Sequence, residues 1–232
     1  ELGEFGFIDR ISLRYPTKHP SIIKGIGDDA AVISYSKDLL ILLSTDQLIE
    51  GFHFRLGTTD GWELGWKSLA VNLSDIAAMG GIPVGFCLSL GIPTQKISVE
   101  FLDDFYKGIT TLGDKVGVEL LGGDTSESGE RLTISVSLLG KASRGKVIYR
   151  GGGKDGDELY VTGWLGDAAL GFKLLEQGVN QKGMENLLKR HLCPNPRTRE
   201  GRLLGEREIP NAMIDISDGL LSDLNHIAVS YT

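Results

Sequence analysis

Apolar and polar positions along the first half of the chain switch between strand-like and helix-like spacing. An unbroken apolar run at residues 39–43 predicts a strand buried on both faces, which ends at the polar residues 44–46. Residues 62–79 carry apolar side chains at helical spacing and stop at a glycine pair, which predicts a helix. A strand at 86–90 and an amphipathic helix at 99–116 follow. This order of strand, helix, strand and helix is typical of an α/β or α+β fold.

A glycine-rich polar stretch at residues 150–157 predicts a boundary between a domain over residues 1–150 and a second domain over residues 151–232. In the first domain we also expect a helix at 4–14 and an antiparallel pair of strands at 119–122 and 132–140. The second domain is predicted to contain strands at 158–162 and 213–216 and helices at 167–175, 184–192 and 220–229. Because about 80 residues cover a sheet poorly, we expect this domain to continue beyond the sequence, and Glu1 in place of methionine suggests the same for the start.

Composition excludes several classes of protein. The chain has 31 acidic and 24 basic residues, a net charge of −7, which argues against a nucleic-acid or anionic-membrane surface and favours cations as partners. Its two cysteines have no CxxC spacing, so a disulfide framework is not expected and a reducing, cytoplasmic setting fits. No apolar run approaches the roughly 20 residues of a membrane helix, and no signal peptide is recognisable.

Two glycine motifs resemble nucleotide-binding loops without meeting their requirements. Residues 25–32, GIGDDAAV, approach the dinucleotide fingerprint, but no helical pattern follows and two adjacent aspartates would repel a pyrophosphate. Residues 140–147, GKASRGKV, match the spacing of a P-loop, but Val147 occupies the position of the magnesium-binding hydroxyl, and a strand pattern follows in place of a helix. Both interpretations are rejected.

Six aspartates share one context, at strand ends or on a helix face beside small residues: Asp29, Asp46, Asp75, Asp124, Asp215 and Asp218. If they converge, their mutual repulsion favours either protonation or the recruitment of cations, and carboxylates beside hydroxyls suit Mg²⁺. Taken singly, each is usually explained as a cap or turn residue, and for Asp218 the cap and ligand interpretations are equally balanced. Asn72 lies three residues before Asp75, so this polar pair shares one face of an apolar helix and is predicted to face something specific.

Three other residues have both a structural and a functional interpretation. His53 follows Asp46 by seven residues and is either an ordinary partly buried histidine or part of the same site. Arg150, among glycines, is either solvated or suited to capturing a phosphate. Tyr106 on the helix at 99–116 is either a packing residue or a platform for a nucleotide.

Five motifs occur in order along nearly the whole chain: GIGDDAAV at 25–32, STD at 44–46 with EGFHF at 50–54, NLSDIAAMG at 72–80, GGDT at 122–125 and DISDGL at 215–220. Together they resemble the thiamine-monophosphate kinase family of the aminoimidazole ribonucleotide synthetase (PurM-like) superfamily. The resemblance implies transfer of the γ-phosphoryl group of ATP to thiamine monophosphate, giving thiamine diphosphate. It also implies a PurM-like two-domain fold, in which the N-terminal mixed sheets of a homodimer join into a shared β-barrel and the nucleotide lies between the domains.

Matched position by position, the resemblance implies roles for individual residues. Several Mg²⁺ ions would be held by Asp29, Ser44, Thr45, Asp46, Asp75, Asp124, Asp215 and Asp218, of which Asp46, Asp75 and Asp124 are the catalytic set. ATP would be contacted by Tyr106, Gly123, Asp124, Arg150 and Ser217, and the thiamine phosphate by His53. Groups that grip the thiamine rings are expected beyond residue 232.

Two rival interpretations remain at this point. One is another enzyme of the superfamily, such as aminoimidazole ribonucleotide synthetase or selenophosphate synthetase. The latter would want a reactive cysteine with a lysine near the N-terminus, and neither Cys87 nor Cys193 lies in such a stretch. The other is a non-catalytic, acidic metal-binding module that forms dimers.

Overall fold

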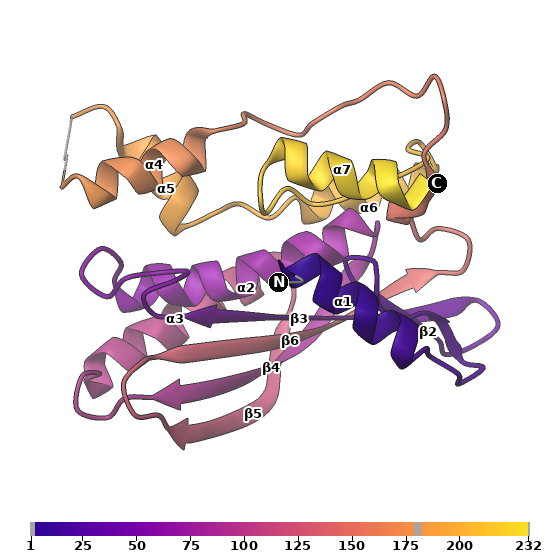
Figure 1. The fold of residues 1–232 in the computed structure, drawn as a ribbon. Helices are drawn as coiled ribbons and strands as arrows, with labels where there is room; N and C mark the ends of the chain where they lie inside the picture. The colour runs from indigo at the N-terminus through magenta and orange to yellow at the C-terminus, as the bar shows by residue number, and fades with distance from the viewer. Residues whose placement is uncertain (1–2, 179–181, 232) are drawn as a thin grey trace.

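The computed structural model describes residues 3–178 and 182–231, which form a mixed six-stranded sheet with helices over one face (Figure 1). The strands are β1 (Ile22–Lys24), β2 (Ala31–Ser34), β3 (Leu39–Ile49), β4 (Ile82–Ile92), β5 (Glu119–Glu127) and β6 (Thr133–Ser143). Their order across the sheet is β1-β2-β3-β6-β4-β5. All neighbours are antiparallel except β4 and β5, which are parallel.

The helices are α1 (Gly3–Arg14), α2 (Gly61–Ala78), α3 (Val99–Val116), the 3₁₀ turn η1 (Arg150–Gly152), α4 (Asp167–Glu176), α5 (Glu185–Leu192), α6 (Thr198–Arg207) and α7 (Leu220–Tyr231). Helix α2 begins at a capping box made by Asp60 and Glu63, which satisfies free N–H groups of its first turn. Helices α2 and α3 approach each other closely at Gly108, where an added Cβ would lie 1.9 Å from the Trp62 carbonyl oxygen. Glycine is therefore required at this crossing.

The molecule is layered, with the sheet on one side, α2 and α3 in the middle, and α4 to α7 outside them (Figure 1). The core lies between the sheet and the middle layer, where Leu73 and Ile76 of α2 and Val136 and Leu138 of β6 are fully or almost fully buried. Helix α6 lies directly on α2. Asp75 of α2 therefore has the sheet on one side and the outer segments on the other.

The structure confirms the expected α/β class and corrects two predictions in the first domain. Strand β3 is not buried on both faces, since Leu42 is fully buried while Leu43 is 43% exposed. The reason is that the described helices cover only one face of the sheet. The strand predicted at 132–140 does not pair with the one at 119–122, because β6 lies between β3 and β4. Helix α3 instead links β4 to β5 as a crossover, which makes those two strands parallel.

Two strands predicted for the second domain are wrong within the described residues, because 158–162 and 213–216 are both irregular. Leu159 and Tyr160 are 57% and 80% exposed, so the apolar alternation there finds no neighbouring strand to pair with. The helices predicted at 167–175, 184–192 and 220–229 are confirmed as α4, α5 and α7, whereas α6 was not expected. The domain boundary near residue 150 stays a prediction. Among the described helices, none has the length and apolar character needed to cross a bilayer.

Candidate functional site

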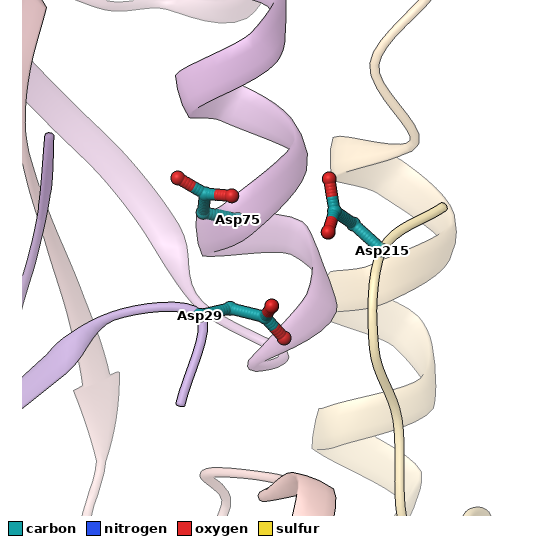
Figure 2. Close-up of side chains that lie close together, drawn as sticks. All are labelled: Asp29, Asp75 and Asp215. Atoms are coloured by element: carbon teal, nitrogen blue, oxygen red, sulfur yellow. The ribbon is translucent and has the colours of Figure 1, made fainter. Parts of the chain in front are cut away.

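Three of the six aspartates meet at one point (Figure 2). Asp29 comes from the loop before β2, Asp75 from α2 and Asp215 from the segment before α7. Each offers a carboxylate oxygen that lies within 4.8 Å of the oxygens offered by the other two. The convergence on which a metal site depends is therefore present for these three residues, which are far apart in the sequence.

The pairing of β2 with β3 brings Asp29 to this point. Ala31 pairs with Leu43 at the start of β2, so the loop before it lies beside the next residues of β3. Beyond Leu43, the edge of β3 that pairs with β2 has no neighbouring strand among the described residues. At Asp46 the side chain of Asn72 from α2 supplies the missing acceptor: the Asp46 backbone N–H donates to Asn72 Oδ1 at 3.2 Å. Asn72 thus ties α2 to β3, which accounts for the polar pair that it forms with Asp75.

Burial and mutual repulsion make the cluster costly to ionise. Burial first, and then the neighbouring carboxylates of Asp46, Asp215 and Asp29, raise the pKa of Asp75 from near 4 to about 9. Burial likewise raises the pKa of Asp29 to about 7, although Arg150 opposes the shift. The pKa of Asp215 rises to about 6, again chiefly through burial. Burial also raises the pKa of Asp46. Without a cation the cluster holds protons near neutral pH.

Two buried oxygens at the site have no hydrogen-bond partner among the described residues: Asp29 Oδ2 and Ser44 Oγ. The other Asp29 oxygen accepts from Arg150, whose Nε lies 3.1 Å away and whose Nη2 also contacts it. Ser44 lies on the helix-covered face of β3 beside the Asp75 carboxyl, where its hydroxyl lowers the Asp75 pKa without making a hydrogen bond of full geometry. Carboxylates with an unpaired hydroxyl suit a hard divalent cation. The donor set therefore fits Mg²⁺.

His53 lies near Asp46, the residue whose pKa is raised chiefly by burial. Its Nδ1 accepts from the Ile49 backbone N–H at 2.9 Å, so the ring proton sits on Nε2. The imidazole is exposed and presents Nε2–H as a donor. His53 thus lies at the edge of the acidic cluster with one donor free for a ligand oxygen.

Ser217 and Asp218 lie in the exposed loop that follows Asp215. This loop is held by Asp223, a buried residue that was not singled out from the sequence: its Oδ2 accepts from the backbone N–H groups of Ser217 and Gly219, both at 3.1 Å. The sequence did contain one indication of its role, because Asp223 is an acid in the first turn of the helix predicted at 220–229, where it can accept from free backbone N–H groups.

The remaining predicted residues lie away from the three clustered aspartates. Thr45 points to the face of β3 opposite Ser44, and its hydroxyl donates to the Val136 carbonyl at 3.2 Å. Asp124 lies on β5 and is exposed, in the same cross-strand row as Ser89 and Gln47. Two strands separate β3 from β5, a distance of about 14 Å. Their predicted roles as ligands stay predictions.

Gly123 of β5 and Tyr106 of α3 were predicted to contact a nucleotide. A Cβ at Gly123 would lie 1.7 Å from the Leu88 carbonyl oxygen, so strand pairing alone explains the glycine. Tyr106 packs edge-on against Phe105, with ring centroids 5.8 Å apart, and its ring is partly exposed. Neither residue touches the aspartate cluster through a described contact.

A cavity of about 780 Å³ opens beside the cluster, in the size range of small-molecule sites. Its lining includes Asp28 and Tyr149, the chain neighbours of Asp29 and Arg150, together with the lysines Lys24, Lys146 and Lys154. Asp28 also accepts from the Arg150 backbone N–H at 3.4 Å. Lys24 and Lys146 form ion pairs with Asp28 and Glu208 of the same lining, so the lining is mixed in charge, with Lys154 as a further basic residue that could face an anionic ligand.

Known proteins resemble this chain in sequence and in fold. The family model of the AIR synthase related protein, N-terminal domain, matches residues 27–142. Thiamine-monophosphate kinase of Buchnera aphidicola subsp. Schizaphis graminum is 44% identical over 98% of this chain and 69% of its own length. The enzyme of that name from Escherichia coli strain K12 is 39% identical over 97% of this chain and 68% of its own length. A solved structure of AaThiL complexed with AMPPCP and TMP superposes with a TM-score of 0.90 and 36% identity, over 99% of this chain and 71% of that one.

Proposed function

The chain belongs to the thiamine-monophosphate kinase family, and on this premise we propose that it transfers the γ-phosphoryl group of ATP to the phosphate of thiamine monophosphate. The observation that carries the proposal is the meeting of Asp29, Asp75 and Asp215. The Buchnera aphidicola and Escherichia coli relatives are named thiamine-monophosphate kinase, and the AaThiL structure is a complex with the ATP analogue AMPPCP and with TMP.

The proposed Mg²⁺ site consists of the clustered carboxylates with Asp46 and the Ser44 hydroxyl. Bound Mg²⁺ would neutralise phosphate charge and align the attacking and leaving oxygens. The unpaired oxygens Asp29 Oδ2 and Ser44 Oγ support this assignment. Thr45, Asp124 and Asp218 are proposed as further ligands of additional ions.

The proposed phosphoryl transfer does not require a strong general base. The acceptor is a phosphate monoester whose second pKa is about 6, so its attacking oxygen is already largely ionised at neutral pH. The residues of this chain therefore act by charge and position. The exposed His53 Nε2–H is proposed as a donor to the acceptor phosphate, and Arg150 is proposed to bind ATP phosphates beside the cavity. Tyr106, Gly123, Asp124 and Ser217 complete the proposed nucleotide contacts.

Three further statements belong to the same proposal. The chain divides into a domain over residues 1–150 and a second over residues 151–232. The protein forms a homodimer through its sheets, with neither nucleic acid nor membrane as partner. It works in the cytoplasm. The acidic net charge of −7 supports only the expectation that neither nucleic acid nor an anionic membrane is a partner.

The test is a direct assay of the full-length protein with Mg²⁺ and ATP, in which thiamine diphosphate is quantified by chromatography. We expect turnover with thiamine monophosphate and none with unphosphorylated thiamine. Asp46→Asn and Asp124→Asn should each lower kcat by orders of magnitude. Turnover of aminoimidazole precursors alone would point to another superfamily enzyme, and failure to bind ATP and Mg²⁺ would point to a non-catalytic module. Unchanged kcat in either variant would remove that residue from the site.

A further inference from the structure

Lys67 lies in α2, eight residues before Asp75, and is partly buried. Its Nζ donates to the backbone carbonyl of His53 at 3.2 Å. Within residues 3–178 and 182–231, no carboxylate lies close enough to form an ion pair with it. A partly buried ammonium without a counter-ion is unusual, because removing a charge from water is costly unless the charge is paired.

The surroundings of Lys67 increase this cost. Of its three N–H donors, the described residues engage one. Burial lowers the pKa of Lys67 to about 8. Beside it, burial and then the Lys67 charge lower the pKa of His191 on α5 to about 4, so this histidine is neutral and supplies no negative charge. The His191 ring packs against Phe172 of α4, with centroids 5.2 Å apart.

The position of Lys67 indicates which anion would pair with it. Eight residues of α2 place its Cα about 12 Å from that of Asp75, so its ammonium serves the His53 end of the site and not the carboxylates themselves. His53 in turn lies near Asp46, which lies near Asp75. The turn that contains His53, where the phosphate-bearing acceptor is proposed to bind, thus has the imidazole donor of His53 and the unpaired ammonium of Lys67 side by side.

We propose that Lys67 binds an oxygen of the acceptor's phosphate group, with its bond to the His53 carbonyl fixing the His53 turn in the orientation that the substrate needs. The inference rests on the proposed function, because it takes the acceptor to be a phosphate monoester. The structural alternative is that Lys67 only ties α2 to the turn. A neutral amide donor at position 67 would preserve that tie, whereas phosphate binding requires the positive charge.

The experiment measures binding in the full-length protein by calorimetry, with thiamine monophosphate and unphosphorylated thiamine as the two probes. Lys67→Gln keeps a donor for the His53 carbonyl, Lys67→Met keeps only the aliphatic length, and Lys37→Met in the exposed turn before β3 is the matched control. We expect both Lys67 variants to bind thiamine monophosphate about 10- to 100-fold more weakly, the loss of one charge-assisted hydrogen bond, and to bind thiamine within twofold of wild type. Lys67→Arg should recover part of the loss.

Each other outcome contradicts the inference. A Lys67→Gln variant that retains the wild-type preference for the phosphorylated ligand would show that only the tie matters. Equal weakening of binding for thiamine monophosphate and thiamine would show a general defect in the protein. The same loss of affinity in Lys37→Met, or a melting temperature far below that of wild type in both Lys67 variants, would lead to the same conclusion. No preference for the phosphate in wild type would also overturn it. Turnover is assayed on the same samples, so a protein that binds the monophosphate through Lys67 without forming the diphosphate would refute the kinase proposal alone.

Discussion

At the scale of single residues, the site stores electrostatic repulsion that a cation relieves. The folded-state pKa of Asp75 is raised to about 9, so its contribution to stability is fully present below its ordinary value near 4 and is lost as the pH rises through about 9. Metal-free protein should therefore become less stable as it is made alkaline. Cation binding, which displaces protons from the cluster, should strengthen over the same range of pH.

Asp75→Asn removes this titration and isolates its effect. In EDTA at pH 9 we expect the variant to melt above wild type, by about 2–4 °C for each kcal/mol of repulsion relieved, and the gap should narrow at pH 5. Added Mg²⁺ should raise the melting temperature of wild type more than that of the variant. Thermal unfolding followed by circular dichroism checks this, with Asp103→Asn on the exposed side of α3 as control. A variant less stable than wild type at pH 9 would show that repulsion does not govern this site.

The sequence predicted six candidate aspartates one at a time, and the structure brings Asp29, Asp75 and Asp215 together. Alternation along β3 sends Ser44 and Asp46 to the helix-covered face and Thr45 to the other, a consequence of the period of two. The β2 register that places Asp29 beside β3 depends on pairing between strands, which local patterns do not reveal. Lys67 and Asp223 were missed because each acts through a backbone group of another segment.

At the scale of elements, α2 is the scaffold of the site, since it carries Asp75 and Lys67 and also anchors β3 through Asn72. Its helical pattern and glycine stop were readable from the sequence, and the structure confirms them. The position of β6 in the middle of the sheet was not readable, because it depends on long-range pairing with both β3 and β4. Helix α6 was not predicted from the sequence. It packs on α2, the helix that carries Asp75.

Gly201→Ala tests whether the α6 contact supports the site. A Cβ at Gly201 would lie 2.1 Å from the Ala77 carbonyl oxygen, so α6 must move away from α2 and displace the segment that leads to Asp215. We expect a loss of stability of about 1–3 kcal/mol and a higher Mg²⁺ concentration for half-maximal activity. Chemical denaturation and a Mg²⁺ titration of turnover measure the two effects. Arg199→Ala, on the exposed side of α6, should leave both unchanged, and an unaltered Mg²⁺ requirement in Gly201→Ala would dissociate α6 from the site.

At the scale of the whole molecule, one face of the sheet has no helix over it within the described chain, and β5 is exposed along its full length at the sheet edge. Natural sheets rarely leave such an edge and face unprotected, because they invite pairing with another chain. Leu43 and Leu121 are exposed apolar residues on these strands. Asp124, a predicted ligand, lies in a cross-strand row with Gln47 and Ser89 on the same uncovered side. Assembly through this side would therefore bring the proposed nucleotide residues of β5 under cover.

Leu121→Asp addresses the proposed homodimer directly. Leu121 is 59% exposed on β5, and a carboxylate buried there in a sheet-to-sheet contact would lack a partner and oppose association. Sedimentation should give wild type at twice the mass of one chain and the variant at the mass of one chain at micromolar concentration, with an unchanged melting profile for the separated subunit. Leu13→Asp is the control, since Leu13 is 83% exposed but lies on helix α1 and not on a strand of the sheet. Dissociation by Leu13→Asp, with Leu121→Asp still dimeric, would move the interface from the sheet to α1.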